Sequence, residues 1–137
     1  MVDDAQGDDA TIEGPASHTV LHIDDSDANI RLVERLFARL PDIEVISATH
    51  GMQGLDIARD RHPAVVLLDL HLPDMPGEQF LRTLKEDPRT ARIPVVAVTG
   101  EVAGDRPDLL RQLGALDVLL KPYRVQELMA ILDRAMV

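Results

Sequence analysis

Five polar residues follow short apolar runs in this sequence. Asp24 and Asp25 end the first run, Asp69 ends the third, and Thr99 and Lys121 end the fourth and fifth. If these runs are parallel strands, their carboxyl ends meet at one edge of a sheet, which is where ligands bind in open α/β folds. Core packing does not require polar residues at these positions. The sequence therefore predicts a functional site built from four strand ends.

The three aspartates predict metal and phosphoryl chemistry. Carboxylates held close together repel one another and raise each other's pKa, so they do not stabilise a fold by themselves. Oxygen ligands without His or Cys favour a hard divalent ion such as Mg²⁺, which commonly uses one or two carboxylates together with phosphate oxygens. Lys121 and Thr99 add a mobile positive charge and a hydroxyl for phosphoryl oxygens. Asp69, alone at a central strand end, is the expected carboxylate nucleophile.

Alternating strands and helices must position these residues. Apolar runs, several of them β-branched, predict five strands, and apolar residues at helical spacing predict five helices between and after them. The expected strands are 19–23, 43–46, 64–68, 93–98 and 117–120, and the expected helices are 30–40, 51–61, 78–86, 105–114 and 125–135. Continuous apolar strands that alternate with helices predict a parallel sheet covered on both faces, which is a three-layer α/β sandwich.

The sequence also predicts the orientation or the local role of four single side chains. Leu40 continues the apolar face of the first helix, and Met52 is expected to face inward from the second. Asp27 is expected to cap the first helix, and Asp74 is expected to be a turn residue, because aspartate is favoured at both kinds of position.

Composition limits the class of protein. The 137 residues, 45% of them apolar, suit one globular domain. No apolar run is long enough to cross a bilayer, and the absence of cysteine fits a cytoplasmic protein. Residues 1–17 hold five acids and no Lys or Arg and so carry −5, whereas residues 18–137 hold 19 acids and 14 bases and also carry −5. We therefore expect an acidic flexible tail at 1–17, a domain at 18–137, and no nucleic-acid or membrane partner.

From residue 19 to residue 136 the chain resembles the receiver domain of two-component response regulators. The resemblance rests on four sequence features in order: Asp24-Asp25, the stretch Leu68-Asp69-Leu70-His71-Leu72-Pro73-Asp74-Met75-Pro76-Gly77, the pair Thr99-Gly100, and Lys121-Pro122-Tyr123. It implies the flavodoxin-like strand order 2-1-3-4-5 and a signalling protein that assists its own phosphorylation rather than a conventional enzyme.

The resemblance also implies roles for individual residues. Asp69 would accept a phosphoryl group from a histidine kinase or a histidine phosphotransfer protein. Asp25, Asp69 and the backbone carbonyl of His71 would bind Mg²⁺ directly, and Asp24 would act mainly through water. In the same family pattern, Lys121 would contact the phosphoryl group ahead of a cis Pro122, and Thr99 would move toward it, with Gly100 leaving room for the adjacent loop. A downstream protein would read the change, and any homodimer would use the last two helices and last strand.

Three positions bear on how the signal is transmitted. Receivers commonly carry an aromatic residue three positions before the lysine, and this chain has Val118 there. We therefore hypothesise that output runs through the loop from Thr99 to Asp105. His71 and Glu101 follow Asp69 and Thr99 by two residues each, so they are either exposed loop side chains or groups that set phosphoryl lifetime.

Alternative functions remain open. A stand-alone regulator is preferred, and a receiver excised from a hybrid kinase or a degenerate Mg²⁺-binding scaffold are the alternatives. A haloacid-dehalogenase-type phosphatase also uses a strand-end Asp, but the stretch from Asp25 to Asn29 lacks the last element of its motif. A dinucleotide-binding enzyme would need a glycine-rich first turn, which is absent here.

Overall fold

The protein is built around one parallel β-sheet. A computed structural model describes residues 18–100 and 106–136. The sheet order is β2-β1-β3-β4-β5, and all neighbouring strands are parallel, which confirms the predicted fold. The strands are β1 (His18–Ile23), β2 (Ile43–Ala48), β3 (Val65–Asp69), β4 (Val95–Thr99) and β5 (Asp117–Leu120).

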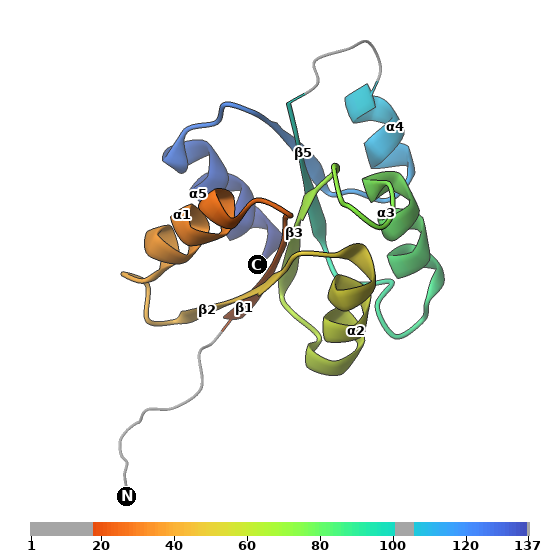
Figure 1. Ribbon diagram of the computed structural model, residues 1–137, viewed down its shortest axis with the longest axis horizontal. Coiled ribbons are helices and arrows are strands. Elements are labelled where there is room, and N and C mark those ends of the chain that lie inside the picture. Colours follow the sequence, from red (N-terminus) through yellow and green to blue (C-terminus); the bar gives the residue numbers. More distant parts are fainter. Residues whose placement is uncertain (1–17, 101–105, 137) are drawn as a thin grey trace, which may run out of the picture.

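Helices cover both faces of this sheet. Figure 1 shows α1 and α5 on one side and α2, α3 and α4 on the other. The helices are α1 (Asp27–Phe37), α2 (Gly51–Arg61), α3 (Gly77–Glu86), α4 (Arg106–Gln112) and α5 (Val125–Ala135). None of the helices in these described ranges combines the length and the apolarity that a membrane crossing requires.

The central strand β3 shows why the two faces form two cores. Val65 and Leu67 pack into the cluster under α1 and α5, whereas Val66 and Leu68 pack into the cluster under α2, α3 and α4. This alternation is the period-two geometry of a strand. All five residues of β3, including Asp69 at its end, are buried. Burying each aliphatic side chain contributes about 1.5–3 kcal/mol, so Asp69 stands on a strongly fixed strand.

Strand register brings the polar ends together. Ile23 of β1 lies beside Leu68 of β3, so the residues that follow, Asp24 and Asp69, end adjacent strands at the same level. On the other side of β3, the backbone N–H of Lys121 donates to the carbonyl of Thr99 at 2.8 Å. The register therefore fixes which strand ends can share one site.

Two expectations about apolar side chains are wrong. Helix α1 ends at Phe37, and Leu40, three residues further on, is 36% exposed. Met52 is 55% exposed because α2 turns Gly51, Gly54, Leu55 and Ala58 toward the core instead. A side chain at Gly51 would come within 2.7 Å of Met75, so the glycine allows the close approach that directs Met52 outward.

Two helix caps also differ from the expectations. Ser26, and not Asp27, is the N-cap of α1, and its hydroxyl accepts the backbone N–H of Asn29 at 3.3 Å. Asp27 is the first residue of the helix, where its charge still interacts favourably with the helix dipole. Asp74 is more than a turn residue: its carboxylate accepts the N–H groups of Gly51 at 2.7 Å and Met52 at 3.0 Å, and so caps α2 from a distant loop.

Candidate functional site

Three aspartates gather at the carboxyl edge of the sheet. One carboxylate oxygen from each of Asp24, Asp25 and Asp69 lies within 4.8 Å of the other two. Asp24 and Asp69 are buried, at 2% and 6% exposure, whereas Asp25 is open to solvent. Such a group is compact enough to surround one cation, with Asp25 on the side from which the cation would enter.

Asp69 has a partner for each carboxylate oxygen. The ammonium of Lys121 donates to Oδ2 at 3.1 Å, and the backbone N–H of His71 donates to Oδ1 at 2.8 Å. Lys121 reaches across from the end of β5, and its peptide bond to Pro122 is cis, as the family resemblance implied. The carboxylate is therefore held in one orientation by two independent contacts.

Asp24 is oriented by residues of β1 and α1. It accepts the backbone N–H of Ser26 at 2.9 Å and the side-chain amide of Asn29 at 3.1 Å, and His22 Nε2 lies 3.6 Å away. Burial raises the pKa of Asp24, but the contacts with His22, Ser26 and Asn29 together outweigh it and hold the pKa below its usual value. Asp24 is therefore ionised at neutral pH.

The cluster carries more negative charge than its lysine can neutralise. Among the described residues, Lys121 is the only Lys or Arg in an ion pair with these three carboxylates. Burial lowers the pKa of Lys121, yet the hydrogen bond and charge of Asp69 reverse this and raise it, so the lysine stays protonated. The donor set consists of oxygens only, which fits a hard divalent cation such as Mg²⁺.

The loop after Asp69 is closed tightly against the sheet. His71 pairs with Pro76 in an isolated bridge, and the N–H of Gly77 donates to the carbonyl of Leu70 at 3.0 Å. A Cβ at Gly77 would lie 2.7 Å from the Leu70 Cα, so only glycine fits there. This closure fixes the backbone of His71 beside the carboxylates and leaves its side chain exposed.

Thr99 and Gly100 complete the edge at the end of β4. Thr99 is buried at the strand end, and a Cβ at Gly100 would meet no described atom within 4 Å. Val118, in place of an aromatic residue, is half-buried and packs against the core. Glu101 and the rest of the loop to Asp105, on which the output hypothesis rests, lie outside the described residues.

A cavity of about 410 Å³ lies beside the site, between α1 and the loop after β5. His22, Leu32 and Tyr123 line it, together with Asp69 and Lys121. His22 is 4% exposed, and its Nδ1 has no hydrogen-bond partner among the described residues. The cavity was not predicted from the sequence, because its walls come from β1, α1, β3, β4 and the β5–α5 loop. The one signal in the sequence was a histidine within an apolar run.

Comparisons with known proteins agree with this geometry. The family model for the response regulator receiver domain matches residues 20–133. The polar-differentiation response regulator DivK of Brucella ovis is 32% identical over 107 residues, which cover 78% of this chain and 86% of that protein. The residues matched by the family model include all the strand ends that carry the polar cluster.

Solved structures show the same fold. The receiver domain of a sensor histidine kinase from Pseudomonas aeruginosa, with a magnesium ion coordinated in its active-site cleft, has 28% identity and a TM-score of 0.79, and covers 88% of this chain and 98% of its own. A chemotaxis protein of Vibrio cholerae has 25% identity and a TM-score of 0.79, with 88% and 99% of the two chains covered.

Proposed function

The chain belongs to the response regulator receiver family, and we propose that it accepts a phosphoryl group on Asp69 in a Mg²⁺-dependent reaction. Receiver domains of response regulators are signalling proteins rather than conventional enzymes. The observation that carries the proposal is the set of three carboxylates within 4.8 Å of one another with one lysine to balance them. A divalent cation and a phosphoryl group would supply the charge and the ligand that this arrangement lacks.

In this proposal the acidic cluster holds the metal. Asp25 and Asp69, with the backbone carbonyl of His71, would bind Mg²⁺ directly, and Asp24 would act through water. When bound, Mg²⁺ would offset carboxylate charge and stabilise the phosphoryl oxygens during transfer. The Mg²⁺-bound receiver from Pseudomonas aeruginosa, at 28% identity, supports this choice of ion.

Groups of this chain would perform the transfer itself. An Asp69 carboxylate oxygen attacks the phosphorus of a phosphohistidine; an O–P bond forms, the P–N bond breaks, and the imidazole nitrogen keeps the electron pair. The N–H of His71 holds the other oxygen, since it already donates to Asp69 at 2.8 Å. Lys121, whose ammonium lies 3.1 Å from Asp69, would move onto a phosphoryl oxygen as negative charge builds up there.

Signalling would follow from the occupied site. Thr99 would turn its hydroxyl toward the phosphoryl group, and Gly100 leaves space for the following loop to adjust. His71 and Glu101 would border the phosphoryl group and set its lifetime. A His71→Ala variant that dephosphorylates at the wild-type rate would exclude His71 from that role.

The donor would be a histidine kinase or a histidine phosphotransfer protein, and a downstream protein would read the phosphorylated state. We propose a stand-alone regulator, because the matched 107 residues make up 86% of DivK, a relative about the size of one receiver. A receiver from a hybrid kinase is the alternative, as in the Pseudomonas aeruginosa neighbour. The absence of cysteine fits a cytoplasmic location. Residues 18–137 would form the receiver, and residues 1–17 a separate acidic segment.

Intact-mass measurement tests the proposal. The protein is incubated with acetyl phosphate, with and without Mg²⁺, alongside an Asp69→Asn variant. We expect a gain of one phosphate that requires Mg²⁺ and is absent from the variant. If neither acetyl phosphate nor a phosphohistidine donor phosphorylates the wild type, the chain is better described as a metal-binding scaffold.

A further inference from the structure

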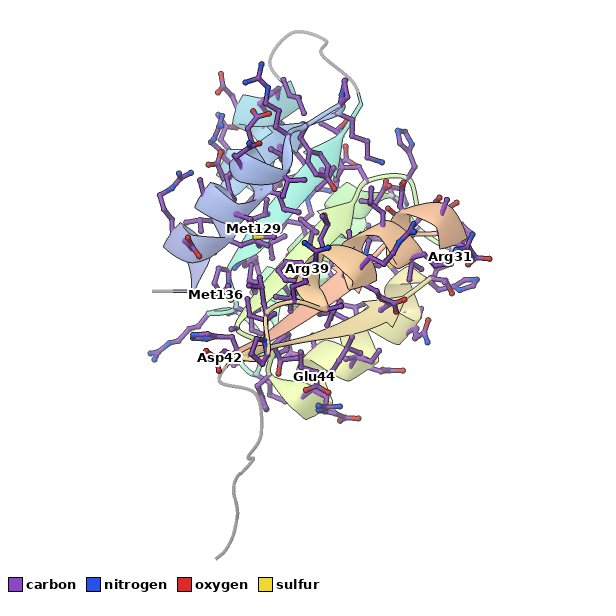
Figure 2. All side chains as sticks on the ribbon, turned by 90° about the vertical axis from the view of Figure 1, so that its left-hand side faces the viewer. Arg31, Arg39, Asp42, Glu44, Met129 and Met136 are labelled. Atoms are coloured by element: carbon purple, nitrogen blue, oxygen red, sulfur yellow. The ribbon has the colours of Figure 1, made fainter. Side chains whose placement is uncertain are left out.

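Three arginines form a basic ridge along the outer side of α1. Arg31 and Arg35 lie on α1 and Arg39 follows in the turn after it, each four residues from the next. Residues four apart lie on one side of a helix, and Ala38 between them keeps helical backbone angles. Figure 2 shows Arg31 and Arg39 apart from each other along this side of the molecule. We call these three residues the arginine ridge.

The arginine ridge is exposed and lacks partners within the described part of the chain. All three side chains are exposed, and none forms an ion pair with a described carboxylate. Three exposed acids lie close in sequence, Asp27 four residues before Arg31, Glu34 between the first two arginines and Asp42 after the third, yet none is paired with the ridge. Five other arginines are paired: Arg59, Arg61, Arg89, Arg111 and Arg134. The ridge therefore offers three positive charges that no described carboxylate pairs, on a protein whose net charge is −10.

The chain joins the sheet next to one end of this ridge. Helix α1 runs antiparallel to β1, so Arg39 lies toward the end at which β1 begins. The N–H of His18, the first residue of β1, donates to the carbonyl of Asp42 at 3.0 Å, three residues beyond Arg39. The 17 residues before His18 hold five acids and no base. A short tether to a surface of opposite charge gives such a segment a high effective concentration there.

The lengths also match. Arg31 and Arg39 are eight positions apart, or about 12 Å at the helical rise per residue. Seventeen residues can span up to about 56 Å when extended, so the segment can run the whole length of α1. Its acids come as two pairs and a single residue, Asp3-Asp4, Asp8-Asp9 and Glu13, spread along that length.

We propose that the acidic segment 1–17 binds the arginine ridge of its own chain. The contact is electrostatic and intramolecular, so it weakens as salt screens the charges and does not depend on protein concentration. It covers the outer side of α1 beside Leu32, which is 46% exposed and lines the cavity next to Asp69. An acidic macromolecule approaching α1 then competes with the segment.

A spin label tests the binding directly. The chain has no cysteine, so Ala5→Cys gives a single labelling site in the acidic segment. We expect the nitroxide to broaden the backbone amide signals of α1 around the arginine ridge at low salt, and the broadening to disappear in 0.5 M NaCl, roughly where screening shortens to a few ångströms. Broadening absent from α1, or unchanged by salt, would overturn the proposal.

Equal charge changes at two places test whether the acidic segment binds the arginine ridge itself or is attracted to any arginine on the surface. Arg35→Glu with Arg39→Glu should abolish the α1 broadening, whereas Arg82→Glu with Arg92→Glu, an equal change on exposed residues in and after α3, should leave it intact. Replacing the five acids by Asn and Gln changes no residue after His18 and should also abolish the broadening. Equal effects of the two arginine pairs, or persistence in the neutralised segment, would contradict the proposal.

A second readout connects the contact to phosphoryl transfer and rests on the proposed function. Neutralising the five acids should speed phosphorylation by a histidine phosphotransfer protein several-fold and leave phosphorylation by acetyl phosphate unchanged. Failure of both donors would count against the proposed function alone, since the spin-label result needs no phosphorylation. Equal rates with the protein donor would show that the segment does not shield α1 from it.

Discussion

Two groups of aspartates in this molecule differ in their positive partners. Asp117, at the start of β5, contacts Arg111 at 3.1 Å and Arg134 at 2.7 Å. Asp87, after α3, contacts Arg59 at 3.2 Å and Arg89 at 2.9 Å. Each of these peripheral carboxylates has two arginines. At the carboxyl edge of the sheet, three carboxylates share one lysine.

The difference separates carboxylates that are paired within the fold from carboxylates that, in the proposed function, would bind a cation. Burial raises the pKa of Asp117, but the hydrogen bond from Val118 and the charges of Arg111 and Arg134 bring it below its usual value. The hydrogen bonds and charge of Arg89 hold the pKa of Asp87 far below its usual range. These carboxylates are satisfied within the fold. The site carboxylates stay short of positive charge, which a divalent cation would supply.

The largest predicted effect is a loss of phosphorylation rate on a substitution at the site that leaves the peripheral carboxylates unchanged. Lys121→Ala removes the one lysine that balances the carboxylates, so phosphorylation by acetyl phosphate should slow by about 10²-fold or more, as for loss of a transition-state donor elsewhere. Arg134→Ala removes a cation from Asp117 and should leave the rate within error of wild type. Intact-mass time courses measure both. A similar rate loss in the two variants would contradict the distinction between the site carboxylates and the peripheral carboxylates.

A smaller effect concerns an acid that lies near the site yet is structural. Asp74→Ala leaves the first N–H groups of α2 without their cap, so the free energy of unfolding should fall by about 1 kcal/mol. Phosphorylation should persist. Asp60→Ala, which removes an exposed carboxylate from the last turn of the same helix, should change stability by less than about 0.5 kcal/mol. Urea denaturation measures the difference, and equal stabilities would show that Asp74 is not a cap.

The smallest predicted effect is on the pH dependence of stability and concerns Asp117, one of the two peripheral carboxylates. Because the folded pKa of Asp117 lies below the ordinary 3.8, its ion pairs stabilise the protein above that value and are lost as the pH falls through the folded pKa. Asp117→Asn should cost less than about 1 kcal/mol at pH 7, and the difference from wild type should shrink toward pH 3. Urea denaturation at the two pH values checks this. A difference that grows on acidification would contradict it.

The sequence was informative where strands end. The fold and the positions of Asp24, Asp25, Asp69, Thr99 and Lys121 follow from apolar runs and from the rule that parallel strands share a carboxyl edge. Each of these patterns is local in the sequence, and the parallel sheet brings the residues that end the strands together at one edge. The roles of these residues remain predictions that the experiments above address.

What the sequence missed depends on contacts between distant segments. Asp74 caps a helix that begins 23 residues earlier, and no local pattern predicts that pairing. Met52 faces outward because glycines let α2 approach Met75 and Ile23, which only the packed structure shows. The cavity beside His22 likewise arises from several elements.

The most direct test of whether the three site carboxylates bind a divalent cation is to measure the thermal unfolding midpoint at increasing Mg²⁺ concentration. The measurement is made on the wild type and on the Asp25→Asn and Asp87→Asn variants. At ten times its dissociation constant, Mg²⁺ should stabilise the wild type by about 1.4 kcal/mol, which raises the unfolding midpoint by about 5 °C. Asp87→Asn should respond as wild type does, and Asp25→Asn should respond much less. A wild-type midpoint that does not move, or an equal rise in Asp25→Asn, would show that the three carboxylates do not form a cation site.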